Sequence, residues 1–322
     1  MCYSAQIRSN YMTFTRMFGA TISLKEFAEL FFRRTEAKLR IPKSLEAEFD
    51  NPAASEEVEI KAAIDTYRAE RQMTLEQELF AQKHRLVEAE RKLQIKPTKG
   101  PLDSQRIATD KISKAQLDLS DLKRQELLDR DHRIFPGWYA PVMVVQDGQK
   151  VVMPMRYLCR PEHAHPSFDV KFSGCYNARR DNLEKFWKKQ FGYTHGVIAL
   201  SGFYENVKRH DMEHRALRPG ETSENIILKF EPNNHQDMLV ACVWSRWTGA
   251  GGEQLLSFAV ITDDPPAEVA AAGHDRCPVP LKRDNVDAWL NADPSNLKLF
   301  QDILEDKERP YYDHRVFEKL AA

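Results

Sequence analysis

The sequence predicts an α+β protein, with a mixed, mostly antiparallel β-sheet or partly closed barrel as its core and a long inserted α-helical hairpin. Two observations carry this prediction. All five tryptophans lie beyond residue 137, where short β-branched or aromatic runs alternate with Gly, Pro and Asn/Asp turns. Residues 56–131 differ, because 16 acidic and 15 basic residues fall among them and Gly100 is their only glycine. That composition is typical of long solvated helices.

The first predicted element is a helix over residues 24–39, because its apolar side chains recur at helical spacing and share one face. Two longer helices follow it. Mostly apolar residues recur at alternating intervals of four and three over residues 75–93 and again over 108–122, and Pro97 and Pro101 interrupt the pattern between them. This spacing predicts two helices that fold back on each other as an antiparallel hairpin.

The hairpin is expected to be an insertion over residues 56–131, within a single catalytic domain formed by residues 1–55 and 132–322. Its mixed charge and nearly aromatic-free composition leave three roles open. It could recruit a protein partner, associate with a second copy, or clamp nucleic acid through the basic side chains near its turn.

Short runs of β-branched and aromatic residues from Pro136 onward are predicted to be strands. These runs cover residues 141–145, 151–153, 196–200, 226–230, 238–243 and 255–261. Turn signals such as Asp147-Gly148 separate them. Few long helices intervene, so a largely antiparallel sheet or partly closed barrel is favoured over a doubly wound fold.

Composition excludes several classes of protein. The chain has 322 residues and a formal net charge of −1, and no run approaches the roughly 20 apolar residues that cross a bilayer. Its five cysteines are odd in number and form no CxxC pair, which argues against a disulfide framework or a zinc ribbon. The N-terminus lacks the basic and apolar segments of a secretory signal, so we expect a cytoplasmic or nucleoid-associated protein with no membrane partner.

Cys2 becomes an unusual nucleophile once Met1 is removed, as expected when the second side chain is small. An N-terminal cysteine places an α-amine, with an ordinary pKa of about 8, beside a thiol with an ordinary pKa of about 8.5. The amine can condense with an aldehyde, and the thiol can then close on the imine carbon to form a thiazolidine. Cys2 alone does not establish this chemistry, because a cysteine can occupy position 2 by chance.

Three later motifs give Cys2 a context. They are Tyr-Asn-Ala-Arg at 176–179, Gly-Phe-Tyr-Glu at 202–205 and Gly-His-Asp-Arg-Cys-Pro-Val at 273–279. With Met1-Cys2 they resemble, in order, the N-terminal Cys, Asn-Ala-Arg, Gly-Phe/Trp-Tyr/Phe-Glu and His-Asp-Arg-Met-Pro signatures of the SRAP family. That family is the SOS-response-associated peptidase domain, which processes abasic sites in DNA. The resemblance covers about residues 1–20 and 134–292 and leaves the hairpin as an insertion.

The resemblance implies catalytic roles for four residues. Cys2 would attack the ring-opened aldehyde of an abasic deoxyribose and trap it as a thiazolidine DNA-protein crosslink. Glu205 would transfer the protons that ring opening and imine formation require. Asn177 can both donate and accept hydrogen bonds, so it suits orienting the amine or the sugar. His274 would shuttle protons, including those of strand cleavage or crosslink reversal.

Four further residues are predicted to contact DNA, and single-stranded DNA with an abasic site is the expected partner. Arg179 and Arg276 would bind the phosphates that flank the lesion, because a planar guanidinium offers phosphate two parallel hydrogen bonds. Trp138 or Tyr157 would supply a platform on which an exposed base stacks, an interaction worth about 1–3 kcal/mol per base.

No cofactor or metal is expected. Cys159, His163 and His165 are possible metal ligands, but no fourth ligand stands at a recognisable spacing from them. The sequence also contains neither a P-loop nor a GxGxxG motif, so it gives no sign of a nucleotide cofactor.

The chain departs from the family pattern at two places. Tyr3-Ser4 stand where the family usually has Gly-Arg, so one expected phosphate-binding arginine is missing. The family's Met-Arg-Trp-Gly-Leu-x-Pro stretch appears at residues 155–161 without its Trp and Gly. Two alternatives stay open: a self-processing or N-terminal-nucleophile thiol peptidase, and a non-catalytic DNA-binding module whose hairpin recruits a partner.

Overall fold

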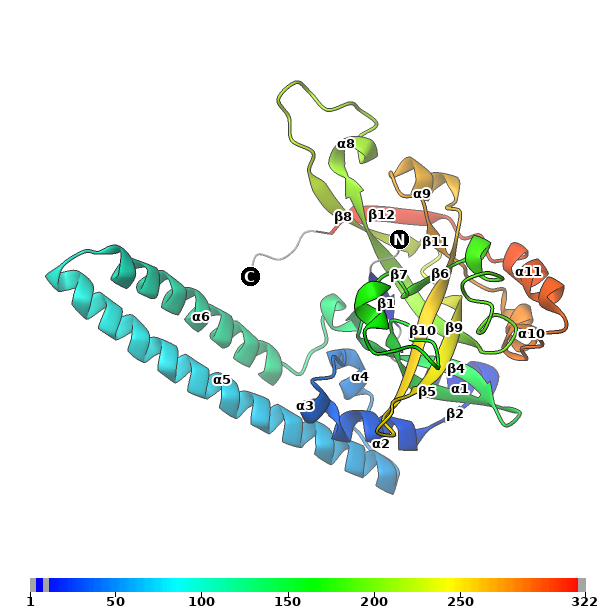
Figure 1. Ribbon diagram of the computed structural model, residues 1–322, viewed down its shortest axis with the longest axis horizontal. Helices are drawn as coiled ribbons and strands as arrows, with labels where there is room; N and C mark the ends of the chain where they lie inside the picture. Colours follow the sequence, from blue (N-terminus) through cyan, green and yellow to red (C-terminus); the bar gives the residue numbers. More distant parts are fainter. Residues whose placement is uncertain (1–3, 8–11, 318–322) are drawn as a thin grey trace. The chain divides into compact units, whose positions relative to one another are not determined.

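The computed structural model describes residues 4–7 and 12–317 (Figure 1). These residues divide into two compact units, one formed by residues 52–127 and the other by the rest of the described chain. The larger unit is a β-barrel with additional strands and short helices, and the smaller one is a helical hairpin. The α+β class predicted from the sequence is therefore confirmed.

Five strands close the barrel of the larger unit. They are β4 (Tyr139–Gln146), β5 (Gln149–Tyr157), β7 (His195–Lys208), β9 (Met238–Thr248) and β10 (Gln254–Asp263). The pairs β4–β5, β4–β7, β7–β9 and β9–β10 are antiparallel, and β10 closes the ring by running parallel to β5. The sheet is therefore mixed and mostly antiparallel, as expected.

Large apolar side chains fill the barrel. Phe203 and Phe230 are fully buried, and their rings stack with centroids 5.0 Å apart. The turn between β4 and β5 consists of Asp147 and Gly148, whose φ angles are 51° and 75°. Positive φ at both positions is typical of the type I′ hairpin turn that Asp-Gly favours, so this turn sets the register of β4 on β5.

Further strands extend the barrel. They are β1 (Ser4–Ile7), β2 (Thr21–Ile22), β3 (Arg133–Ile134), β6 (Asn177–Arg179), β8 (Asn225–Pro232), β11 (Cys277–Pro278) and β12 (Tyr312–Val316). Strand β1 lies between β3 and β7 and is antiparallel to both. Strand β6 is parallel to β10, and β8 lies between β7 and β12. The N-terminal strand is thus an interior strand of the sheet.

Short helices surround these strands. The α-helices of this unit are α1 (Met12–Phe18), α2 (Leu24–Phe32), α3 (Arg34–Ala37), α4 (Lys43–Ala47), α7 (Phe168–Lys171), α8 (Arg209–Met212), α9 (Ala267–Ala271), α10 (Val286–Leu290) and α11 (Leu297–Glu305). The 3-10 helices are η1 (Asp129–His132), η2 (Arg180–Asn182) and η3 (Arg283–Asn285). Among the helices formed by the described residues, none combines the length and apolar character that a membrane span requires.

The helix predicted over residues 24–39 is interrupted. Helix α2 ends at Phe32, and α3 continues only as far as Ala37, where Lys38 takes a left-handed conformation with φ of 50°. A buried ion pair between Arg34 and Glu46, 2.6 Å long, ties α3 to α4. The prediction of helix over this segment is correct. The apolar spacing does not reveal the break after Phe32, which the ion pair between Arg34 and Glu46 accompanies.

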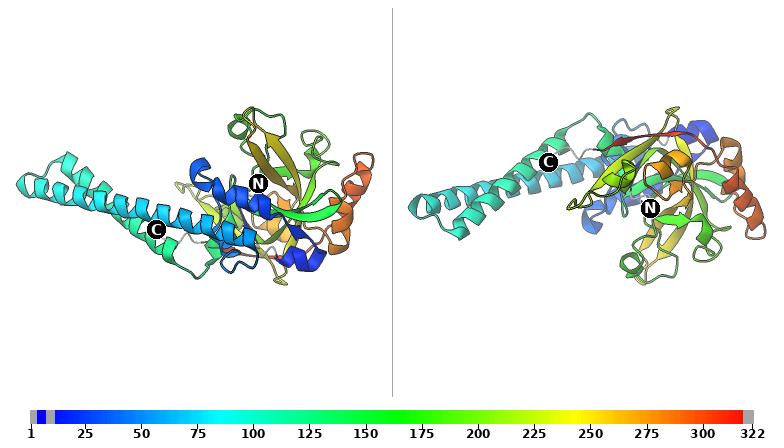
Figure 2. Two further views of the ribbon diagram at one scale, coloured as in Figure 1. Left: turned by 90° about the horizontal axis from the view of Figure 1, so that it is seen from below. Right: turned by 90° about the horizontal axis from the view of Figure 1, so that it is seen from above.

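The smaller unit consists of α5 (Ser55–Ile95) and α6 (Lys99–Lys123), which lie side by side in Figure 1 and in both views of Figure 2. Its buried seam includes Leu75, Ala89, Ala108 and Ala115. Exposed ion pairs such as Lys111 Nζ with Glu78 Oε1, 3.7 Å apart, also link the two helices. The predicted antiparallel hairpin is confirmed, and α5 begins well before its predicted apolar repeat.

Candidate active site

A carboxylate and an imidazole meet in the larger unit. Glu205 lies on β7 with 1% of its surface exposed, and His274 Nε2 lies 2.9 Å from Glu205 Oε2. His274 Nδ1 lies 2.9 Å from the backbone carbonyl oxygen and 3.3 Å from the backbone nitrogen of Arg276, so this stretch of backbone holds one side of the ring. The other ring nitrogen then faces the carboxylate, so the pair can pass a proton between a carboxyl and an imidazole.

Gly273 makes the turn that directs His274 toward this carboxylate. Its φ is 91°, a conformation that residues with a side chain rarely adopt. A Cβ at this position would also lie 3.2 Å from the Asp211 Cβ. Glycine is therefore suited to this position both by its conformation and by the limited space.

Asn177 comes from β6 and is 7% exposed. It pairs with Val260 of β10, and its Oδ1 accepts a hydrogen bond of 3.4 Å from the hydroxyl of Tyr157. The Tyr157 ring has no exposed surface and stacks on Phe258 with centroids 5.3 Å apart. The predicted base-stacking role of Tyr157 therefore does not fit this structure, because the core covers its ring. Its hydroxyl orients Asn177 instead.

Strand β1 is held firmly beside Glu205. Ser4, its first residue, lies opposite Tyr204, and the Ser4 hydroxyl accepts hydrogen bonds of 2.9 and 2.7 Å from Arg133 Nε and Nη2. The Arg133 guanidinium carbon also lies 3.9 Å from the centroid of the Tyr204 ring. The Tyr204 hydroxyl donates a 2.7 Å hydrogen bond to Gln6 Oε1. These contacts fix the register of β1 on β7.

No local sequence pattern marks Arg133 as a residue that fixes β1. Its partner Ser4 is 129 positions away in the chain, so no local spacing relates the two. Cys2 itself lies outside the described residues.

The four cysteines that the structure describes are buried. Burial raises the pKa of Cys175 to about 11 and that of Cys277 to about 12. Burial likewise raises the pKa of Cys159 and of Cys242 far above the ordinary value for a thiol. A thiol must lose its proton to become a strong nucleophile, so these four are unsuited to nucleophilic attack at neutral pH.

Both predicted phosphate-binding arginines form ion pairs. Arg179 Nη2 lies 2.8 Å from Asp181 Oδ2, and Arg276 Nη1 lies 2.8 Å from Asp264 Oδ1. The two aspartates are mostly exposed, with 61% and 89% of their side-chain surfaces accessible. Such pairs contribute little to stability, so a phosphate could replace either carboxylate.

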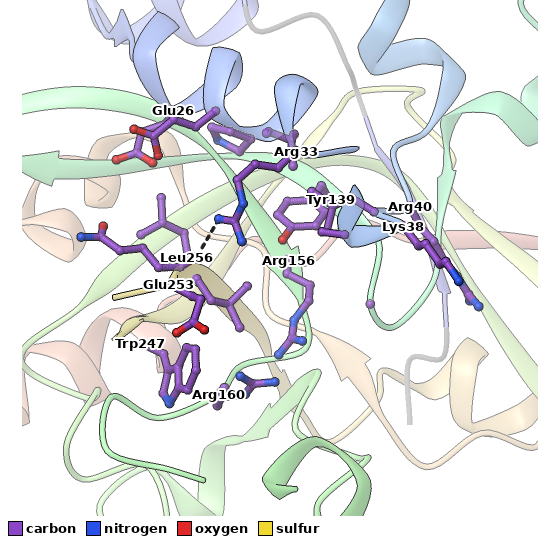
Figure 3. A pocket seen from close by; sticks show the side chains of 18 of the residues that line it. Glu26, Arg33, Lys38, Arg40, Tyr139, Arg156, Arg160, Trp247, Glu253 and Leu256 are labelled. Carbon is purple, nitrogen blue, oxygen red and sulfur yellow. Dashed lines mark hydrogen bonds between the residues drawn. The ribbon is translucent and has the colours of Figure 1, made fainter. Parts of the chain in front are cut away.

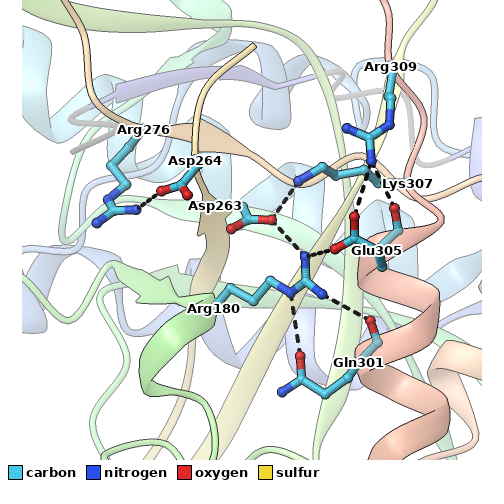
Figure 4. Close-up of polar contacts among 8 residues, drawn as sticks. All are labelled: Arg180, Asp263, Asp264, Arg276, Gln301, Glu305, Lys307 and Arg309. Atoms are coloured by element: carbon cyan, nitrogen blue, oxygen red, sulfur yellow. Dashed lines mark hydrogen bonds and ion pairs between the residues drawn. The ribbon is translucent and has the colours of Figure 1, made fainter. Parts of the chain in front are cut away.

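Arg180 has a different environment from Arg179. Figure 4 shows it between Asp263 and helix α11, where its guanidinium bonds to Asp263 Oδ2 at 2.9 Å and Glu305 Oε2 at 2.7 Å. Lys307 Nζ also lies 2.5 Å from Asp263 Oδ2. Arg180 therefore links the turn after β6 to α11.

Aromatic side chains other than Tyr157 are accessible. Trp138 is partly buried, and its ring centroid lies 5.7 Å from that of Phe135. Phe172 and Phe186 are 38% and 44% exposed, with ring centroids 5.9 Å apart, on segments that precede and follow β6. No local sequence pattern marks these two phenylalanines. Among the aromatic side chains named here, they expose the most surface.

Metal ligands do not gather in the part of the chain that the structure describes. No group of three or more His, Cys, Asp or Glu side chains there is arranged to hold an ion. Cys159 is fully buried, whereas His163 and His165 are exposed. The three residues considered from the sequence therefore differ in their surroundings.

One comparison with known proteins identifies the family of this chain. No curated protein matches the chain in sequence. Solved structures of a protein from Bordetella bronchiseptica and of one from Bacteroides thetaiotaomicron are each 17% identical to it with TM-scores of 0.46. The match to the Bordetella bronchiseptica protein covers 61% of this chain and 90% of that one. The match to the Bacteroides thetaiotaomicron protein covers 60% of this chain and 81% of that one. The family model described as SOS response associated peptidase (SRAP) matches residues 103–319, more than half of the 322 residues, and the chain belongs to the SRAP family.

Proposed function

We propose that this protein captures abasic sites in single-stranded DNA by forming a covalent thiazolidine through Cys2. The observation that carries the proposal is the buried pair of Glu205 and His274 beside strand β1. Ser4 follows Cys2 by two positions in the sequence. It is the first residue of β1 and lies opposite Tyr204, the residue before Glu205. This pairing supports the proposal that Glu205 and His274 serve the N-terminal nucleophile.

The proposed reaction releases one water. After removal of Met1, the α-amine of Cys2 adds to the aldehyde carbon of the ring-opened sugar, and the resulting carbinolamine loses water to give an imine. The thiol of Cys2 then adds to the imine carbon, and its proton passes to the imine nitrogen. Glu205 and His274 would supply and accept the protons of dehydration, and Asn177 would orient the reacting groups. This substrate is consistent with a cytoplasmic or nucleoid location.

Single-stranded DNA that carries one abasic site tests the proposal directly. Incubation with the mature protein should give a slowly migrating band on denaturing electrophoresis, and mass spectrometry should show a chain that begins at Cys2 and has gained the DNA minus one water. An undamaged strand of the same sequence is the control. A protein that loses Met1 but forms no adduct would instead favour the peptidase alternative.

Reversible binding should depend on Arg179, which is half exposed, and on Arg276, which is mostly buried. Arg179→Ala and Arg276→Ala are each expected to weaken affinity for undamaged single strands. Each should also reduce the magnitude of the slope of log affinity against log salt by about 1, because binding releases fewer counterions when one phosphate contact is missing. Fluorescence anisotropy at several salt concentrations measures both quantities. Arg71→Ala is a matched control, since Arg71 is exposed, is paired with Asp118 and lies far from the turn of the hairpin. Unchanged slopes in both variants would assign these arginines to structural ion pairs.

The hairpin is expected to be dispensable for crosslinking. Replacement of residues 52–127 by a short Gly/Ser linker should leave a folded protein that forms the adduct at nearly the normal rate, because the proposed reacting groups all lie outside this unit. Circular dichroism and the electrophoretic assay measure the two outcomes. Loss of DNA affinity with intact folding would support a DNA clamp, and loss of a dimer in light scattering would support self-association.

A further inference from the structure

A polar pocket lies outside the candidate active site, on the outer face of the barrel (Figure 3). Its volume is about 430 Å³, within the range of small-molecule sites. Arg156 of β5 lines it, whereas the next residue, Tyr157, belongs to the hydrophobic core. Because successive strand residues point to opposite faces, the pocket and the barrel interior lie on opposite sides of β5.

The pocket is separate from the candidate active site. Leu256 of β10 lines the pocket, and Val260, four residues later on that strand, pairs with Asn177. Four residues of extended strand span about 13 Å. A ligand held at one site therefore need not occupy the other.

Positive charge predominates among the lining residues, which carry a net charge of +2. The cations are Arg33, Lys38, Arg40, Arg156 and Arg160, and the carboxylates are Glu26, Glu29 and Glu253. Glu26 already lies 3.5 Å from Arg246, which does not line the pocket. In the view of Figure 3, Glu26 lies at the upper left and Lys38 and Arg40 at the right, so the charges are unevenly distributed.

Three of the cations are available for an anion. Arg33, Lys38 and Arg40 are exposed, and within the described residues none of them forms an ion pair with a carboxylate. Arg33 donates one hydrogen bond, 3.3 Å long, to the backbone carbonyl oxygen of Gln254. Lys38 has a φ of 50°, at a helix end where glycine is usually favoured. A lysine there places a cation at the pocket despite its less favourable backbone conformation.

The other two cations are held in place. Arg156 and Arg160 both bind the carboxylate of Asp169, with N–O distances of 2.7 and 2.5 Å. The Arg160 guanidinium also lies 4.5 Å from the Trp247 ring centroid. Two guanidinium groups that share one carboxylate retain a net positive charge, and their fixed geometry suits an oxyanion.

The charges of three arginines act on the hydroxyl of Tyr139. Burial raises the pKa of Tyr139, while the charges of Arg156, Arg33 and Arg160 act in the opposite direction. An anion bound in the pocket would reduce the mutual repulsion of these like charges.

We propose that this pocket binds the phosphate groups of a nucleotide unit, either as a free nucleotide or as part of a strand. Arginine forks match phosphate oxygens, and the partly exposed Trp247 lies beside them in the lining. Arg33, Lys38 and Arg40 lie outside residues 103–319, the segment that matches the SRAP family model. The part of this chain that the family model does not cover thus supplies three of the five cations of the proposed site, and Arg156 and Arg160 come from the part that it covers.

Removal of two exposed charges tests the pocket without disturbing buried contacts. The test variant carries Lys38→Gln and Arg40→Gln, and the control carries Lys83→Gln and Lys114→Gln, which are exposed residues of the hairpin. Calorimetry at low salt uses AMP, adenosine and inorganic phosphate as probes. Anisotropy at several salt concentrations uses an undamaged single strand. Neither readout requires a reaction at Cys2, so failure of the proposed crosslinking would be distinguishable.

For a free nucleotide, AMP should bind at least about tenfold more tightly than adenosine, and the test variant should lose about tenfold in AMP affinity. If the pocket binds part of a strand, AMP should bind weakly. The test variant should then lose affinity for the oligonucleotide, and the slope of its log affinity against log salt should fall by about 2. Either pattern, with the hairpin control unchanged, supports the proposal. If the test variant and the control bind AMP, phosphate and the strand equally well, the proposal is overturned.

Discussion

A Cys2→Ala variant is expected to form no covalent adduct with abasic single-stranded DNA, even after long incubation with excess protein. Alanine retains the α-amine, so it can form an imine, but it lacks the thiol that closes the thiazolidine ring. The imine alone is reversible and should not survive denaturing electrophoresis. Reduction with borohydride before electrophoresis should recover a band in this variant. That recovery would show that binding and amine attack remain intact.

Cys277→Ala is the matched control for the thiol. Cys277 is 4% exposed, and burial raises the pKa of its thiol to about 12. Its replacement should therefore leave most of the adduct, after correction for any loss of folded protein measured by thermal unfolding. If Cys277→Ala abolished the stable adduct and Cys2→Ala retained it, the nucleophile would be misassigned.

Glu205→Gln is expected to slow adduct formation at saturating DNA by about 10²–10⁴-fold, the usual contribution of a positioned general acid or base. Glutamine keeps the size of the side chain but cannot exchange a proton with His274 Nε2, which lies 2.9 Å from the carboxylate. Single-turnover rates from quenched electrophoresis measure this effect. Affinity for the undamaged strand should be little changed, because Glu205 is 1% exposed and lies among protein atoms.

The joint action of the two residues can be measured with His274→Asn and the double variant. Groups that act as one unit have non-additive effects, so the double variant should be little slower than the slower single variant. Fully additive losses would show that Glu205 and His274 act on separate steps. A normal rate in Glu205→Gln would remove this carboxylate from the mechanism.

Local sequence patterns predict the parts of this fold that depend on neighbouring residues. The four-and-three spacing anticipates the hairpin, and Asp147-Gly148 anticipates a turn whose two φ angles are positive. The order of the motifs also identifies Asn177, Glu205 and His274 as members of one family pattern. None of these predictions requires knowledge of which distant strands become neighbours.

The remaining features depend on contacts between distant segments. Closure of the barrel requires the parallel pairing of β10 with β5, which no local signal specifies. Tyr157 has an aromatic ring of the kind that stacks on bases, yet Phe258 and the rest of the core cover that ring. Arg133 resembles any surface arginine in the sequence, but it is 6% exposed and bonded to Ser4. Burial decides both cases, and burial is a property of the assembled fold.

The interior position of β1 has a consequence for synthesis of the chain. Ala5 pairs with Ile134 on one side and with Phe203 on the other, so this strand has neither partner when it leaves the ribosome. At about 5–20 residues per second, about 200 residues take roughly 10–40 s to translate. Strand β1 is thus synthesised first but cannot take its interior place in the sheet until β7 has left the ribosome.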